Sequence, residues 1–134
     1  MLSILIHQDY DTLIDNNKYP SIAVKIVEHK FSEIGNCVEK RNANLRMCSI
    51  SEYSEDKDSE NVFIKIGGTP FLIQDEETYY KELEEHGFFF FLSIDEDGYS
   101  EDVIIGSYPF GYGALYLYKH HMTNEIIAGF WQYS

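Results

Sequence analysis

The chain is poor in cysteine, in proline and in positive charge. Its 134 residues include 2 Cys, 3 Pro and 10 Lys+Arg. Two thiols without CxxC spacing cannot build a disulfide scaffold. Free thiols in a reducing compartment are the simpler alternative to a single bridge between Cys37 and Cys48. We therefore expect a cytoplasmic protein.

A long hydrophobic run is also missing. Residues 1–6 are mostly apolar, but the polar residues His7, Gln8 and Asp9 follow at once. Such a run is too short for the core of a signal peptide and much too short for a membrane span. It is typical of a first β-strand.

Negative charge, by contrast, is abundant and unevenly placed. The chain has 23 Asp+Glu against 10 Lys+Arg, a formal net charge of −13. Residues 52–102 hold 16 of these acids and only three lysines, whereas the charges of the two flanks cancel. A surface this acidic repels phosphate backbones and anionic lipid headgroups, so we expect neither a nucleic acid nor a membrane as the partner.

The acids gather in three clusters, at 52–60, 75–85 and 95–102. One interpretation is that they are solvated loops and a solvated helix face that keep a small protein soluble. The other is that they form a patch that receives a basic partner. The sequence alone leaves both open.

Most of the chain has the alternating pattern of β-strands. Strands are predicted at 1–6, within 20–31, at 45–50, 62–66 and 88–95, at 114–118 and within 125–133. At 88–95 the even positions stay apolar, so they are predicted to share one face, with Ser93 on the more exposed one. Asp97-Gly98 then fits a tight hairpin turn with a returning strand at 103–105.

One helix is predicted after residue 75. Asp75 can cap its start, Gly87 can end it, and Glu77 with Lys81 forms a favourable i,i+4 pair. A short helix or turn is expected within 10–17. The expected class is α+β, mostly β: a single domain, 1–134, of twisted antiparallel sheet or sheets with one or two short helices packed on or beside them.

Motifs that carry chemistry are weak here. Gly67-Gly68-Thr69-Pro70 lacks the Lys-Ser/Thr of a phosphate loop, and a sharp turn between two strands explains it better. Asp95 to Gly98 resembles part of a calcium loop, but both end ligands are missing, which favours a turn. The histidines lack metal-ligand spacing, and no serine lies in a GxSxG. We expect no enzyme, no metal and no cofactor.

A second loop is rich in aromatic residues. Residues 107–113 read Ser-Tyr-Pro-Phe-Gly-Tyr-Gly, and include Tyr108, Phe110 and Tyr112. These rings can cap the open end of the sheet. Alternatively, they form a contact surface, because loop tyrosines supply a large contact area at low entropic cost.

The half of the chain that follows Ile64 resembles the YwqG-like family of bacterial proteins. The resemblance lies in Ile66-Gly67-Gly68-Thr69-Pro70-Phe71-Leu72-Ile73-Gln74, in Leu92-Ser93-Ile94-Asp95, and in the glycine loop that leads into 114–118. Leu72 and Ser93 depart from the Trp and Gln that are common in the family. The resemblance implies structural roles for Gly67, Gly68, Pro70 and Gln74, with Gln74 bonding backbone at a strand end. It also implies a link to bacterial toxin systems.

Together, charge and resemblance lead to a functional hypothesis. The chain is predicted to be a bacterial immunity protein that binds a basic toxin domain, with a nuclease as the toxin that best fits an acidic surface. The alternative is a housekeeping domain that binds a small molecule or peptide in an aromatic cleft, and a carboxylate-dyad hydrolase is the least favoured third. The residues predicted to contact the partner are acids and tyrosines of the last two clusters and the aromatic loop: Asp75, Glu76, Asp95, Asp97, Glu101, Asp102, Tyr108 and Tyr112.

Overall fold

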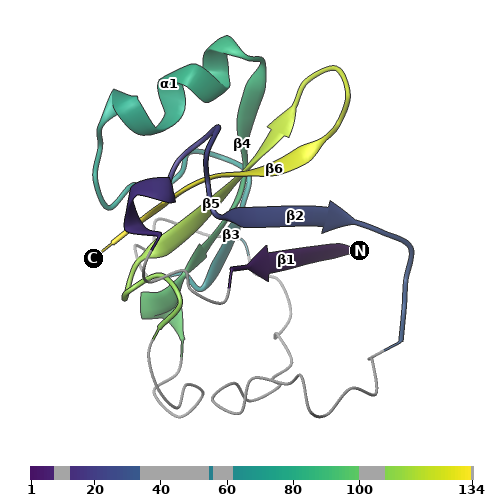
Figure 1. Ribbon diagram of the computed structural model, residues 1–134, viewed down its shortest axis with the longest axis horizontal. Helices are drawn as coiled ribbons and strands as arrows, with labels where there is room; N and C mark the ends of the chain where they lie inside the picture. The colour runs from purple at the N-terminus through teal and green to yellow at the C-terminus, as the bar shows by residue number, and fades with distance from the viewer. Residues whose placement is uncertain (8–12, 34–54, 56–61, 100–107, 134) are drawn as a thin grey trace.

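The computed structural model describes residues 1–7, 13–33, 55, 62–99 and 108–133. They form a two-stranded antiparallel sheet and a four-stranded antiparallel sheet, which confirms the predicted α+β, mostly β class (Figure 1). The first sheet consists of β1 (Leu2–Ile6) and β2 (Val24–Glu28). The second has the order β3 (Ile64–Ile66), β4 (Phe88–Asp95), β5 (Ala114–His120) and β6 (Ile126–Gln132). No helix in the described ranges is long and apolar enough to cross a membrane.

Among the described residues, three short helices accompany the strands. They are the α-helix α1 (Glu77–Glu85) and the 3-10 helices η2 (Ile14–Asn16) and η4 (Glu96–Gly98). The strand predicted at 45–50, the returning strand at 103–105 and both cysteines lie outside the described residues.

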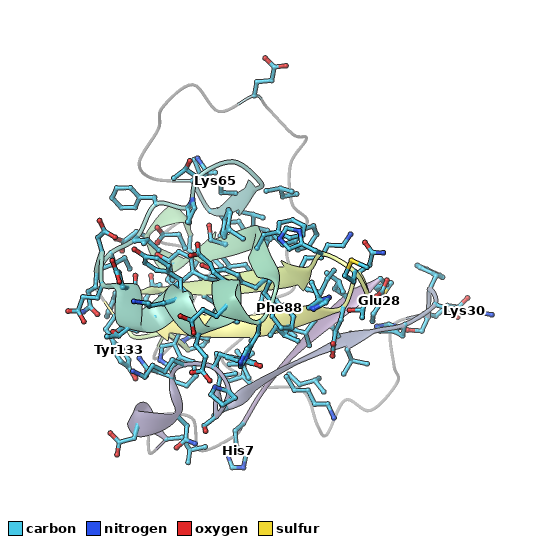
Figure 2. All side chains as sticks on the ribbon, turned by 90° about the horizontal axis from the view of Figure 1, so that it is seen from above. His7, Glu28, Lys30, Lys65, Phe88 and Tyr133 are labelled. Atoms are coloured by element: carbon cyan, nitrogen blue, oxygen red, sulfur yellow. The ribbon has the colours of Figure 1, made fainter. Side chains whose placement is uncertain are left out.

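The four-stranded sheet is the middle of three layers. On one face, Leu115, Leu117 and Trp131 pack against Val24 and the partly buried side chains of the β1–β2 sheet. On the other face, Tyr116 and Phe130 pack against Leu83 of α1. Figure 2 shows the β1–β2 ribbon extending beyond the larger sheet toward Glu28 and Lys30. Both faces of β5 are therefore covered, and its first five residues are buried.

The pairing of β5 contains one β-bulge on each side, with β4 and with β6. The register shifts in β4 between Phe90 and Leu92, and in the β5–β6 pairing after Tyr116. A bulge adds one residue to a strand and reverses which face the following side chains occupy. The prediction that the even positions of β4 share one face is therefore wrong. Phe90 packs on the α1 side, Leu92 packs on the β2 side, and Ser93 is buried.

Gly129 occupies the extra position in β6. The close approach of α1 explains why this residue is glycine. A side-chain carbon at Gly129 would lie 2.6 Å from Cδ2 of Tyr118 and 2.9 Å from Cδ1 of Leu83. The absence of a side chain lets Leu83 sit directly on the sheet, where it is fully buried.

The predicted helix is confirmed, but its cap is not the predicted one. Glu76, in extended conformation, is the N-cap residue, and its side chain makes no capping hydrogen bond, so Asp75 lies one position before the cap. Lys81 Nζ lies 3.3 Å from Glu77 Oε2, which confirms the predicted pair. Gly87 follows the helix with a positive φ, as expected.

The glycines of the Gly67-Gly68 turn have φ values of 68° and 70°, in the left-handed region that glycine enters without strain. The turn leads into the loop before α1, and not into another strand as predicted. Pro70 is half-buried in that loop. The side chain that bonds backbone at a strand end was expected to be Gln74. In the structure it is Gln132, which is fully buried. Gln132 Nε2 donates to Gln74 O at 2.7 Å, and Gln132 Oε1 accepts from Gln74 N at 3.1 Å.

The layers predict unequal costs for two aromatic truncations. Trp131 is buried between the sheets, so Trp131→Ala is expected to lower the free energy of unfolding by about 3–5 kcal/mol. Phe90 is only half-buried, so Phe90→Ala should cost less, roughly 1–3 kcal/mol. Denaturant unfolding of both variants measures this. A larger loss at Phe90 would contradict the described packing.

Candidate functional site

A buried carboxylate joins the end of β4 to the aromatic loop. Glu96, the first residue of η4, is only 1% exposed. Its Oε1 accepts a hydrogen bond from Phe110 N at 2.8 Å and its Oε2 accepts one from Tyr112 N at 2.9 Å. Its backbone N donates to Gly113 O at 2.9 Å. The loop 110–113 is thus held to the sheet end by three bonds to one residue.

Burial changes the acidity of this group. Removal of the carboxylate from water raises the pKa of Glu96 to about 7, although the backbone N–H groups that bind it act in the opposite direction. The nearby negative charge of Asp95 raises it slightly further. This role was not predictable from the sequence, because Glu96 lies inside an acidic run that has the pattern of solvated surface.

The turn that contains Asp97 is not the predicted hairpin. Asp95 Oδ1 accepts from Asp97 N at 3.0 Å and Tyr99 N donates to Glu96 O at 3.1 Å, so Asp97 and Gly98 lie in a 3-10 turn. This local side-chain bond competes with a hairpin. Asp95 is half-buried, and burial raises its pKa. Asp97 is exposed and carries the negative charge that this turn presents to solvent.

Four aromatic rings form a continuous row beside this turn. The centroid of Tyr99 lies 4.5 Å from that of Phe63 and 6.2 Å from that of Tyr108, and Tyr108 lies 4.2 Å from Tyr112. Tyr112 is 58% exposed and has a φ of 63°, which is rare for a bulky residue. Its bond to Glu96 holds this strained conformation, and strain of this kind concentrates at functional sites.

Asp95, Asp97, Tyr108 and Tyr112 therefore share one end of the four-stranded sheet. Glu101 and Asp102, which were predicted with them, lie outside the described residues. Asp75 and Glu76 lie elsewhere, at the start of α1. The sequence predicted the residue types of this surface, but neither the Glu96 anchor nor the rings of Phe63 and Tyr99.

A second candidate binding site is a cleft of about 390 Å³. It lies between the loop that follows Gly67-Gly68 and the helix α1, with Phe90 and Tyr118 of the sheet also in its lining. Among the described residues, no group of three His, Cys, Asp or Glu side chains is arranged to hold a metal ion.

The fold and both sites define an acidic α+β domain with a tyrosine-rich surface at one sheet end. Comparison of the chain with family models, with curated proteins and with solved structures finds no match.

The Glu96 anchor predicts a pH effect on stability. Glu96 titrates near 4.5 in the unfolded chain and near 7 in the folded protein. Between these values the folded state holds more protons, so this group lowers the free energy of unfolding as pH rises from about 4.5 to about 7. In Glu96→Gln this contribution disappears, and one N–H of the loop also loses its acceptor.

We expect the stability gap between the wild type and Glu96→Gln to be largest near pH 4.5 and to narrow by about 1–3 kcal/mol by pH 7.5. Denaturant unfolding at several pH values measures the gap. Glu85→Gln, which removes an exposed carboxylate from α1, is the control. Its free energy of unfolding should change with pH in parallel with that of the wild type. A constant gap for Glu96→Gln would contradict the raised pKa.

Proposed function

We propose that the chain is a non-catalytic binding protein for a basic protein partner, and that it acts as a bacterial immunity protein against a toxin domain such as a nuclease. The observation that carries the proposal is the tyrosine pair formed by the half-buried Tyr108 and the exposed Tyr112, which the buried Glu96 fixes beside the exposed Asp97. The resemblance to YwqG-like proteins, in the Gly67-Gly68 motif and in the residues near Asp95, supports the setting in a toxin system.

The surface has the properties of a prepared binding site. Tyrosine supplies large contact area with few rotatable bonds, so little entropy is lost on binding. The three bonds to Glu96 order the loop before a partner arrives, which reduces the cost of association further. The net charge of −13 attracts a basic protein over a long range and speeds the encounter.

The aromatic cleft supports the alternative, a domain that binds a small molecule or peptide. Its lining combines rings with carboxylates, and its volume lies within the range of small-molecule sites. The two functions use different surfaces, because Asp95, Asp97, Tyr108 and Tyr112, which form the tyrosine surface, do not line the cleft.

The test of the immunity function begins with the neighbouring reading frames. We expect a large secreted protein with a variable carboxy-terminal domain to be encoded next to this chain, and that domain is the toxin to be tested. We expect that domain to arrest growth when expressed alone and to be harmless when this chain is co-expressed. Unrelieved toxicity, together with no binding between the two purified proteins, would overturn the proposal.

Charge reversal tests which surface binds. Asp97→Lys should slow association with that toxin domain roughly threefold or more, and should flatten its salt dependence. Asp95 is unsuitable for this test because its side chain caps the turn. Glu82→Lys makes the same charge change on the exposed face of α1 and is the matched control. Association rates are measured by surface plasmon resonance. Equal slowing by both variants would show that the overall negative charge of the protein, and not a contact at this surface, sets the association rate.

A further inference from the structure

The cleft beside α1 has the lining of a cation site. Its charged residues are Asp75 and Glu84, both negative, and no Lys, Arg or His of the described residues lines it. Phe71, Tyr80, Phe90 and Tyr118 supply aromatic rings. Aromatic faces attract organic cations, and carboxylates attract them more strongly, whereas an anionic ligand would be repelled.

The two carboxylates are free to bind. In the described part of the chain, neither the Asp75 nor the Glu84 side chain has a hydrogen-bonding or ion-pairing partner, unlike Glu77, which pairs with Lys81. The negative charges of Asp75, Glu77 and Glu84 act on Tyr80, whose pKa is raised by partial burial first and by these charges next. Burial and the charge of Glu84 likewise raise the pKa of Tyr118. The potential in the cleft is therefore negative at both phenols.

The loop wall of the cleft is fixed by buried residues of the sheet. Tyr116 Oη donates to Phe71 O at 2.8 Å, and Gln132 exchanges two hydrogen bonds with the backbone of Gln74. Tyr79 Oη donates to Gln74 Oε1 at 2.7 Å, which ties the loop to α1 as well. Tyr116 and Gln132 are both fully buried. The wall is therefore set by the core before any ligand binds, and Phe71 remains 51% exposed at the cleft.

The spacing of the carboxylates indicates an extended ligand. Asp75 precedes α1 and Glu84 lies in its last turn, so their backbones are separated by roughly the length of the helix, about 13 Å at 1.5 Å per residue. A compact ion could contact both groups only if both side chains extended toward each other along the helix. A chain of methylene groups with an ammonium group at each end matches it, because its apolar stem can lie on Phe90 and Tyr118 while its ends meet the carboxylates.

We propose that this cleft binds an extended organic cation of the linear polyamine class, with Asp75 and Glu84 each holding one terminal ammonium group. The site is distinct from the tyrosine surface and goes beyond the proposed function, so either can fail without the other.

The test is calorimetric titration of the full chain with spermidine at physiological ionic strength, with the aromatic NMR signals of Tyr80 and Tyr118 followed in parallel. We expect saturable binding of one spermidine and shifts of both tyrosine signals. Mg²⁺, a compact dication, is expected to give neither. Glu84→Gln and Asp75→Asn should each weaken binding about tenfold, since each removes one charge-assisted contact.

Glu85→Gln is the matched control, because it removes one carboxylate from the same helix outside the cleft. Unchanged affinity in this variant supports the site. Equal weakening by Glu85→Gln, no weakening by either cleft variant, or the same binding with Mg²⁺ would show a counterion atmosphere only and overturn the proposal. Absence of saturation would overturn it as well. Thermal melting of each variant verifies that the fold is intact, which the exposure of all three carboxylates leads us to expect.

Discussion

The position of the tyrosine surface depends on one buried carboxylate. Glu96 lies where β4 ends, and it takes up two backbone N–H groups of a loop that returns 14 residues later. Burying a charged group is costly unless it is well bonded, and the raised pKa of Glu96 records that cost. The loop gains a fixed shape in exchange, including a conformation at Tyr112 that a tyrosine rarely adopts on its own. The exposed ring of Tyr112 is therefore positioned by an acid that solvent barely reaches.

The same principle recurs at the end of β6. Gln132 is a buried polar side chain that satisfies both of its hydrogen-bonding groups on the backbone of a distant loop. That loop forms one wall of the cleft, as the loop bound by Glu96 forms the tyrosine surface. Both candidate sites therefore lie on irregular segments held by buried polar groups of the sheet. A rigid sheet with loops fixed in this way is a common arrangement for binding sites.

The sequence predicted strands and helix well, because their signals are local. The bounds of β4 agree with the pattern at 88–95, and α1 lies where its charges and Gly87 indicated. The faces of β4 were not predictable, since the bulge near Phe91 follows from pairing with β5. Glu96 and Gln132 gave no local signal either. Their burial depends on loops that arrive from far along the chain, and in the sequence each is an ordinary polar residue.

The most direct test of the anchor is a site-resolved NMR titration of the Glu96 side-chain carboxyl carbon, recorded together with the backbone amide protons of Phe110 and Tyr112. We expect all three signals to follow a single transition near pH 7, since the carboxylate and the two N–H groups share one set of hydrogen bonds. A carboxyl carbon that titrates near 4.5, with both amide signals unchanged across the transition, would show that Glu96 is solvated and does not hold the loop.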